Sequence, residues 1–249
     1  MGGHSHWSTI KRQKGASDAK RGQLFTRLSR EISVAAREGG PDPSMNPRLR
    51  LAIDKAKADN MPNDTIKRAV ERGGPGDANA LEEITFEGYG PGGVAILVQT
   101  VTDNRNRTVS ALRTALSRNN GSLGESGSVA WQFDQCGLIV VDPEGKDADE
   151  IALVAIDAGA DDVQMQGEQV EVYTAQTDLD KVRKALDESG LKIATAELSM
   201  LPKNSVPLDE STAPQALRLL DVIEELDDVQ KVYSNADFPD SVLMEYAAG

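Results

Sequence analysis

Lysine and arginine are the side chains of this sequence whose number and spacing could do chemistry. Residues 1–72 contain 15 Lys and Arg against 8 Asp and Glu, whereas residues 73–249 contain 12 against 32. Cationic side chains neutralise phosphates and release their counterions, which gives sequence-independent affinity for nucleic acid. The formal net charge of −13 therefore conceals a basic N-terminal segment on an acidic body. This distribution favours nucleic-acid contact through residues 1–72.

The basic candidates lie in an N-terminal arm and in the helix expected after it. Apolar residues recur every four positions between about Asp18 and Glu38, which predicts an amphipathic helix. Arg27 and Arg30 fall beside its apolar arc, whereas Arg21 falls within it. The alternative is an ordinary solvated charged face. The full set of candidates for phosphate contact here is Lys11, Arg12, Lys14, Lys20, Arg21, Arg27 and Arg30.

Two further candidates lie near the start of the arm. Trp7 could stack on a base, or it could dock the arm onto a helical core. His4 is a candidate nucleic-acid contact as well. The segment Gly2-Gly3-His4 could hold Cu(II) or Ni(II) once Met1 is removed. Any chain with histidine third would do so, and we therefore predict no functional metal.

A second group of candidates stands between an expected strand and an expected helix. Asn104, Arg105 and Arg107 precede or open that helix, where the N-terminus attracts phosphate. The alternative is that these side chains cap the helix and pair with local acids. The residues leave both interpretations open.

The pattern of apolar residues predicts an α+β chain that begins with three short helices. Asn46 followed by Pro47 is typical of a helix start, and Gly39-Gly40 and Gly73-Gly74 are typical of helix ends. The middle then reads as β-β-α-β, and residues 137–200 read as β-α-β-β-α-β, the ferredoxin-like order. The expected middle elements are the strands Ile84–Tyr89, Val94–Thr102 and Val129–Phe133 and the helix Asn106–Asn119.

One helix and one strand are left over after the ferredoxin-like series. The helix is expected at Ala213–Leu226 and the strand at Val229–Ser234. This helix and strand complete the middle β-β-α-β series. We expect the added strand to lie beside the first strand of that series. The predicted architecture is an N-terminal three-helix domain followed by two ferredoxin-like α/β sandwich domains, one inserted in the other. The expected bounds are 1–79 for the basic helical domain, 80–135 plus 204–249 for the discontinuous domain, and 136–203 for the insertion.

Several function classes are disfavoured by what the sequence contains. Both histidines lie in the arm, where no third group holds them rigidly for acid–base or nucleophilic catalysis. A single cysteine, Cys136, rules out intrachain disulfides and CxxC zinc sites and favours a reducing cytoplasm. The glycines of Gly88–Gly93 lead into a strand, the wrong context for a dinucleotide fingerprint. The longest apolar run, Val94–Val98, is too short to span a bilayer. We therefore predict no enzyme, no cofactor, no small-molecule substrate, no membrane partner and a cytoplasmic location.

Several longer motifs are similar to those of a known family. The first motif is His4-Ser5-His6-Trp7, and a second is Thr102-Asp103-Asn104-Arg105-Asn106-Arg107-Thr108. Others include Asp18-Ala19-Lys20-Arg21-Gly22, Asn60-Met61-Pro62 and Phe86-Glu87-Gly88-Tyr89-Gly90-Pro91-Gly92-Gly93. Together they resemble the YebC/PmpR family of probable transcriptional regulatory proteins, relatives of a mitochondrial translational activator. One departure is His6, where the family is expected to carry lysine.

The resemblance implies three domains and association with nucleic acid or the ribosome, without known catalysis. Together with the charge distribution, it predicts a nucleic-acid-binding regulator of gene expression, foremost a DNA-binding transcriptional regulator. The alternative is a ribosome- or RNA-associated translation factor. The expected partner is accordingly DNA, or RNA and the ribosome. No helix carries a recognisable base-reading motif.

Overall fold

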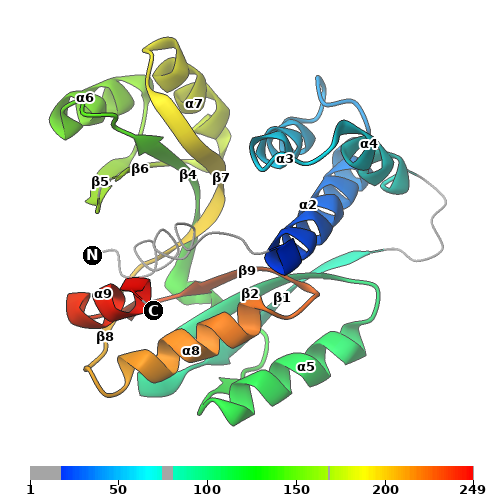
Figure 1. The fold of residues 1–249 in the computed structure, drawn as a ribbon, viewed down its shortest axis with the longest axis vertical. Helices are drawn as coiled ribbons and strands as arrows, with labels where there is room; N and C mark the ends of the chain where they lie inside the picture. The colour runs from blue at the N-terminus through cyan, green and yellow to red at the C-terminus, as the bar shows by residue number, and fades with distance from the viewer. Residues whose placement is uncertain (1–17, 75–80, 168, 249) are drawn as a thin grey trace. The chain divides into compact units, whose positions relative to one another are not determined.

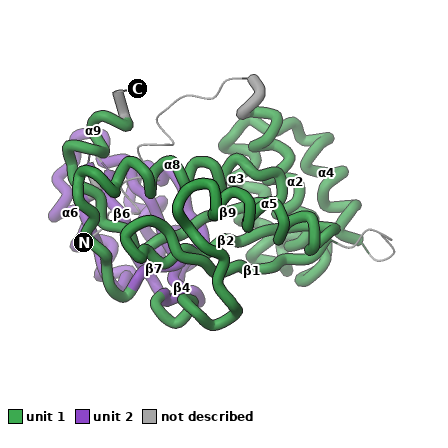
Figure 2. Tube along the Cα trace, turned by 90° about the horizontal axis from the view of Figure 1, so that it is seen from below, with its two compact units in different colours: residues 1–132, 203–249 green, residues 133–202 purple. Residues whose placement is uncertain are grey.

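The computed structural model describes residues 18–74, 81–167 and 169–248. They form two compact units (Figure 2). Unit 1 comprises residues 1–132 and 203–249, and unit 2 comprises residues 133–202. The chain leaves unit 1 after Gln132 and returns at Lys203, whose backbone N–H donates to the carbonyl of Gln132 at 2.8 Å. Unit 2 therefore begins and ends at adjacent points of unit 1.

Unit 1 begins with a group of three helices, α2 (Asp18–Gly39), α3 (Pro47–Ala58) and α4 (Asn63–Arg72). Asn46 connects the first two. Its side chain accepts from the N–H of Leu49 and donates to the carbonyl oxygens of Ala35 and Gly40. Gly40 has φ +88, a left-handed conformation that glycine adopts without a Cβ penalty. The buried apolar core is formed mainly by Leu28, Ile32, Leu49, Ala52, Ile66 and Ala69.

A four-stranded antiparallel sheet forms the rest of unit 1, in the order β3-β1-β2-β9. Helices α5 (Arg105–Arg118) and α8 (Ala213–Glu224) pack side by side on the sheet (Figure 1). Their apolar faces bury Leu112, Leu116 and Leu219 against Phe86 and Ile96. The strands are β1 (Glu82–Tyr89), β2 (Ala95–Thr102), β3 (Ser122–Leu123) and β9 (Val229–Ser234).

Two sequence-based expectations for this sheet are wrong. The leftover strand β9 pairs with β2 and not beside the first strand. Residues 129–133 do not form a strand of this sheet. A 3-10 turn, η2 (Ala130–Gln132), stands there, and the two-residue β3 pairs with β1 instead. The reason is that the Glu87 carboxylate accepts the backbone N–H groups of Val129 and Ala130, so that they are not available to a strand ladder.

Smaller elements complete unit 1, and apart from the turn between β1 and β2 none of them was expected from the sequence. The turn η1 (Pro91–Gly93) connects β1 to β2. The short strands β8 (Val206–Pro207) and β10 (Ala236–Asp237) pair in parallel. The last helix, α9 (Asp240–Ala248), buries Val242 and Leu243 in the same core as the sheet.

Unit 2 has the ferredoxin-like order that the sequence predicts. Its sheet runs β5-β6-β4-β7, with every neighbouring pair antiparallel. Strand β4 starts at Phe133, earlier than expected, because Phe133 already pairs with Pro202. The fold class is confirmed. The elements are β4 (Phe133–Asp142), α6 (Ala148–Ala158), β5 (Asp162–Gln166), β6 (Gln169–Thr174), η3 (Gln176–Asp178), α7 (Leu179–Glu188) and β7 (Lys192–Pro202).

Candidate nucleic-acid interface

Part of the sequence-predicted interface lies outside the described residues. This holds for the arm candidates His4, Trp7, Lys11, Arg12 and Lys14, as well as for the Gly2-Gly3-His4 segment. Lys20 lies in α2, but its side chain is not described. Arg21, one residue further along the helix, is exposed.

The next two arginines of α2 face the sheet region of unit 1. Arg27 donates a hydrogen bond to the backbone carbonyl of Glu224. Arg30 donates to the carbonyl of Asp227 and lies 3.2 Å from the carboxylate of Asp228. Both side chains are half-buried. Their charges are therefore engaged by the loop between α8 and β9, and they are not presented to solvent as the sequence suggested.

Burial dominates the electrostatics of Arg27. It lowers the pKa of the guanidinium, and the carboxylates of Glu224 and Asp227 offset part of that effect. Arginine nevertheless stays protonated, because its ordinary pKa lies far above physiological pH. The charge of Arg27 is thus held against carbonyl and carboxylate oxygens within the protein.

The carboxylate of Asp228 is the centre of this contact. Its side chain is only 8% exposed, and it lies 2.9 Å from Nη2 of Arg107 and 3.2 Å from Nη1 of Arg30. The hydroxyls of Thr108 and Thr102 lie 2.8 and 3.2 Å from the same carboxylate. Charge-assisted bonds of this kind are about twice as strong as neutral ones. Asp228 therefore connects α2, β2, α5 and β9.

The loop candidates Asn104 and Arg107 are engaged within the protein. The Asn104 side chain accepts the N–H of Arg107 at 3.0 Å and caps α5. The hydrogen bond to Asp228, then that to Asp103, raises the pKa of Arg107. Capping and local pairing thus account for both residues. Arg105 is exposed and has no ion-pair partner among the residues that the structure describes.

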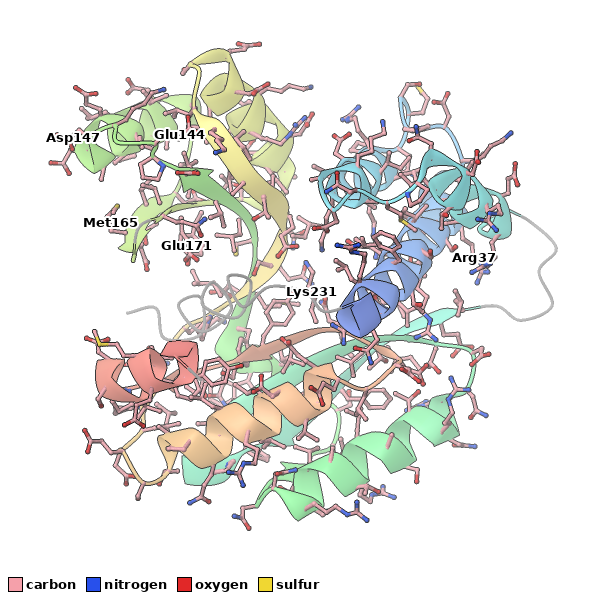
Figure 3. All side chains as sticks on the ribbon, in the orientation of Figure 1. Arg37, Glu144, Asp147, Met165, Glu171 and Lys231 are labelled. Atoms are coloured by element: carbon pink, nitrogen blue, oxygen red, sulfur yellow. The ribbon has the colours of Figure 1, made fainter. Side chains whose placement is uncertain are left out.

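Two further arginines link the three-helix group to the sheet. Arg37, labelled in Figure 3, donates to the carbonyl of Leu81 at 2.9 Å. Arg48 forms ion pairs with Glu38 and, at 2.6 Å, with Glu83 at the start of β1. Several cationic side chains of the helical group therefore form hydrogen bonds or ion pairs within unit 1.

Other cations of the helical group remain at the surface. Lys57 of α3 and Arg72 of α4 are exposed, and neither has an ion-pair partner within the described ranges. Lys67 has only an i,i+4 pair with Glu71 at 4.0 Å, which is weak at an exposed site. These residues contribute to the excess of positive charge in residues 1–72, but they were not among the candidates predicted from the sequence.

A loop beside β1 presents two exposed aromatic rings. Trp131 is 65% exposed and Tyr89 is 37% exposed. The indole N–H and the phenol O–H each donate to the carbonyl of Ser128 at 3.1 Å. The carboxylate of Glu87 anchors the loop through the backbone N–H groups of Gly127, Val129 and Ala130. Burial would raise the pKa of Glu87, but these backbone donors outweigh it and hold the pKa below its ordinary value.

In the described part of the chain, no group of three or more His, Cys, Asp or Glu residues could hold a metal ion. Cys136 is buried and not in a disulfide. None of the helices with described residues is long and apolar enough to cross a membrane.

Comparison with known proteins decides the family. Residues 5–75 match the model of the TACO1/YebC protein N-terminal domain, and residues 81–236 match that of the TACO1/YebC second and third domain. The chain belongs to the TACO1/YebC family. The resemblance read from its motifs is thereby confirmed.

Members of the TACO1/YebC family match along nearly the whole chain. A "probable transcriptional regulatory protein" of Dehalococcoides mccartyi is 56% identical over 247 residues, covering 99% of this chain and 98% of the relative. One of Herpetosiphon aurantiacus is 56% identical over 249 residues, with 99% of each covered. A crystal structure of a conserved hypothetical protein from Aquifex aeolicus superposes with a TM-score of 0.85 and 44% identity, over 90% of this chain and 93% of that one.

Proposed function

We propose that this protein is a nucleic-acid-binding regulator of gene expression, foremost a DNA-binding regulator of transcription. One observation carries the proposal: residues 1–72 hold 15 Lys and Arg against 8 Asp and Glu on a chain whose remainder is strongly acidic. The names of the relatives, probable transcriptional regulatory proteins, support it. The second candidate is a translation factor that binds RNA or the ribosome, since electrostatic contact with phosphate does not distinguish the two.

The contact surface that we propose combines the arm with exposed cations of the helical group. Lys11, Arg12 and Lys14 supply the arm's charge. Lys20 and Arg21 follow, and His4 and Trp7 can add hydrogen bonding and stacking. Arg27 and Arg30 take a different role in this proposal. They hold the helical group against the loop at Glu224, Asp227 and Asp228.

We propose a binding protein in the cytoplasm and not an enzyme. A general acid or base, a nucleophile and an oxyanion donor must converge at a reacting atom. The described residues offer no histidine, and Cys136 is buried. The strongest carboxylate arrangement, at Asp228, is saturated by arginine and threonine partners. Such saturation is typical of a structural carboxylate and not of one poised to accept a proton.

Salt titration of binding tests the proposal. The full chain is titrated against a short fluorescein-labelled DNA duplex, and separately against an RNA duplex of the same sequence, by fluorescence anisotropy. If about four to six cations reach phosphates, log affinity falls against log salt with a slope of about −4 to −5 on DNA. The variant Lys11→Glu/Arg12→Glu/Lys14→Glu should weaken binding and flatten the slope.

A control variant places two charge reversals elsewhere, against three in the arm variant. Lys181 and Lys184 of α7 lie exposed in unit 2, and their reversal to Glu should leave binding within about twofold. Crosslinking in cells followed by sequencing of the bound nucleic acid separates the two candidates, because promoter DNA supports the first and ribosomal RNA the second. Equal binding by the arm variant and the parent would contradict the proposal.

A further inference from the structure

Helix α5 carries an arginine-rich face that the contacts within unit 1 leave uncovered. Its sequence from Arg105 to Arg118 contains four arginines and no acid, and the acid-free stretch extends from Asn104 to Gly124. This stretch lies in the part of the chain where acids otherwise greatly outnumber bases, 32 against 12 over residues 73–249. A solvated helix face in such a region would be expected to carry acids.

The buried side of α5 fixes which residues face outward. Thr108, Leu112, Ala115 and Leu116 are buried against the sheet and α8. At about 100° per residue, Ser110, Thr114 and Ser117 fall opposite that side, and all three are exposed. Arg113 and Arg118 flank this strip of hydroxyls, each about 70° from its centre.

The flanking arginines differ from those of α2 in having no partner of their own. Arg113 and Arg118 are exposed, and in the described ranges neither forms an ion pair or a side-chain hydrogen bond. The same is true of Arg105 on α5 and of Arg218 on the adjacent α8. The nearest acid along the chain before α5, Asp103, is already paired with Arg107 at 2.8 Å. These guanidinium groups therefore keep their full hydrogen-bonding capacity.

We infer that this face of α5, defined by Arg113 and Arg118 with the strip Ser110, Thr114 and Ser117, binds the phosphodiester backbone of a nucleic acid. Guanidinium groups bind phosphate oxygens in a bidentate manner, and the hydroxyls of Ser110 and Ser117 can donate to the same backbone. The hydroxyl of Thr114 already donates to the carbonyl of Ser110 at 2.8 Å. From Ser110 to Arg118 the helix rises about 12 Å. That is about three to four phosphate steps of one strand at 3.4 Å each.

This inference rests on the proposed function and adds a second contact to it. A face with arginines at its edges and no apolar centre fits a polyanion better than a protein partner, since protein interfaces are built around buried apolar anchors. The hydroxyl strip contains no Arg, Lys, Asn or Gln, the side chains that read base edges in a bidentate manner. We therefore expect a contribution to affinity and orientation with little effect on sequence preference.

Charge reversal on α5 in the full chain tests the inference. Arg113→Glu/Arg118→Glu should weaken binding to the labelled DNA and RNA duplexes by about 10-fold or more and flatten the salt slope on DNA by about 2, because each lost phosphate contact removes about 0.9. Arg113→Lys/Arg118→Lys keeps the charge and should keep the salt slope of the parent, because that slope counts neutralised phosphates. The unit 2 control, Lys181→Glu/Lys184→Glu, makes the same change in net charge and should not move affinity. Unchanged thermal unfolding establishes that the α5 variants are folded.

The outcomes separate this inference from the proposed function. If the arm variant loses binding and the α5 reversal binds like the parent, the α5 inference is overturned and the proposed function stands. If the parent binds neither duplex, both fail. If only the α5 reversal loses binding, the α5 face is supported and the arm is not the contact.

A site-specific crosslink distinguishes nucleic acid from a protein partner. Ser110 lies near the centre of the face and is exposed, so Ser110→Cys can carry a maleimide-linked photo-crosslinker, while the native Cys136 is buried. In cell extract we expect the crosslinked product to be sensitive to nuclease. A crosslinked product that resists nuclease and contains a second polypeptide would overturn the inference in favour of a protein partner.

Discussion

Helices α2 and α5 of unit 1 both carry several arginines, yet the arginines of the two helices differ in whether they bind other groups of the protein. Arg27 and Arg30 of α2 donate to backbone carbonyls of the loop at Glu224–Asp228. On α5, Arg107 shares Asp228 with Arg30, whereas Arg113 and Arg118 remain exposed. Positive charge in a sequence therefore does not by itself mark an anion-binding surface. What decides is whether the fold supplies an internal acceptor.

Asp228 is the residue on which this difference depends most. Its carboxylate receives arginines from both helices and a hydroxyl from Thr108. Removing one partner of a buried ion pair is costly, because the remaining charges stay desolvated. Asp228 thus stabilises α2 on the sheet at the same time as it orders the start of α5.

The largest effect should therefore follow from Asp228→Asn. We expect a loss of about 2–3 kcal/mol in the free energy of unfolding, less than the 3–5 kcal/mol of a fully buried pair, because Arg107 is half-exposed and keeps Asp103. Chemical denaturation followed by tryptophan fluorescence measures it. Asp103→Asn removes the exposed partner of the same arginine and should cost far less than Asp228→Asn, because exposed ion pairs contribute little to stability. Equal losses in the two variants would show that Asp228 is not the centre of the contact.

Glu87 provides a contrast with Asp228, because it is a buried carboxylate that accepts hydrogen bonds from backbone N–H groups and not from arginine. Its two oxygens accept the N–H groups of Gly127, Val129 and Ala130 at 2.6, 2.7 and 2.8 Å. In Glu87→Gln an amide group with its own hydrogens would face one or two of these donors. We expect a loss of about 2 kcal/mol, the cost of leaving buried donors unsatisfied, measured by the same denaturation.

The pKa of Glu87 also gives this prediction a direction in pH. Its folded-state pKa lies below the ordinary value, which is about 4.3 in an unfolded chain. The stabilisation is therefore fully present above about pH 4.3 and is lost as the pH falls through the folded pKa. The difference in stability between the parent and Glu87→Gln should accordingly shrink below pH 4. A constant difference from pH 3 to pH 7 would contradict the assignment.

Local signals predicted most elements of the fold, and tertiary contacts explain the failures. The helix start at Asn46 and Pro47 could be predicted because the capping residue directly precedes the helix that it caps. The strand expected at Val129–Phe133 was not formed, because its amides bind Glu87, some forty residues earlier. No spacing rule links two such segments before the fold brings them together.

The candidate site was predictable in its charge and not in its geometry. The excess of Lys and Arg in residues 1–72 is visible in the sequence. That Arg27 and Arg30 would meet acceptors 197 residues away is not. The α5 face was missed for a different reason. Leu112 and Leu116 are buried as their spacing predicts, but only the structure shows that Arg113 and Arg118 have no partner among the described residues. An acid-free stretch in an acidic region was the available signal.

The smallest effect tests the comparison of the two helices most directly. Arg30→Ala should cost about 1–2 kcal/mol in the free energy of unfolding, because it removes charge-assisted bonds to Asp228 and to the carbonyl of Asp227. Arg113→Ala/Arg118→Ala removes two guanidinium groups that have no partner among the described residues and should change stability by less than about 0.5 kcal/mol. Denaturation midpoints at equal slopes, compared at low and high salt, measure both. If the α5 variant lost as much stability as Arg30→Ala, Arg113 and Arg118 would have a structural role. The distinction between arginines bound within the fold and arginines available to a ligand would then fail.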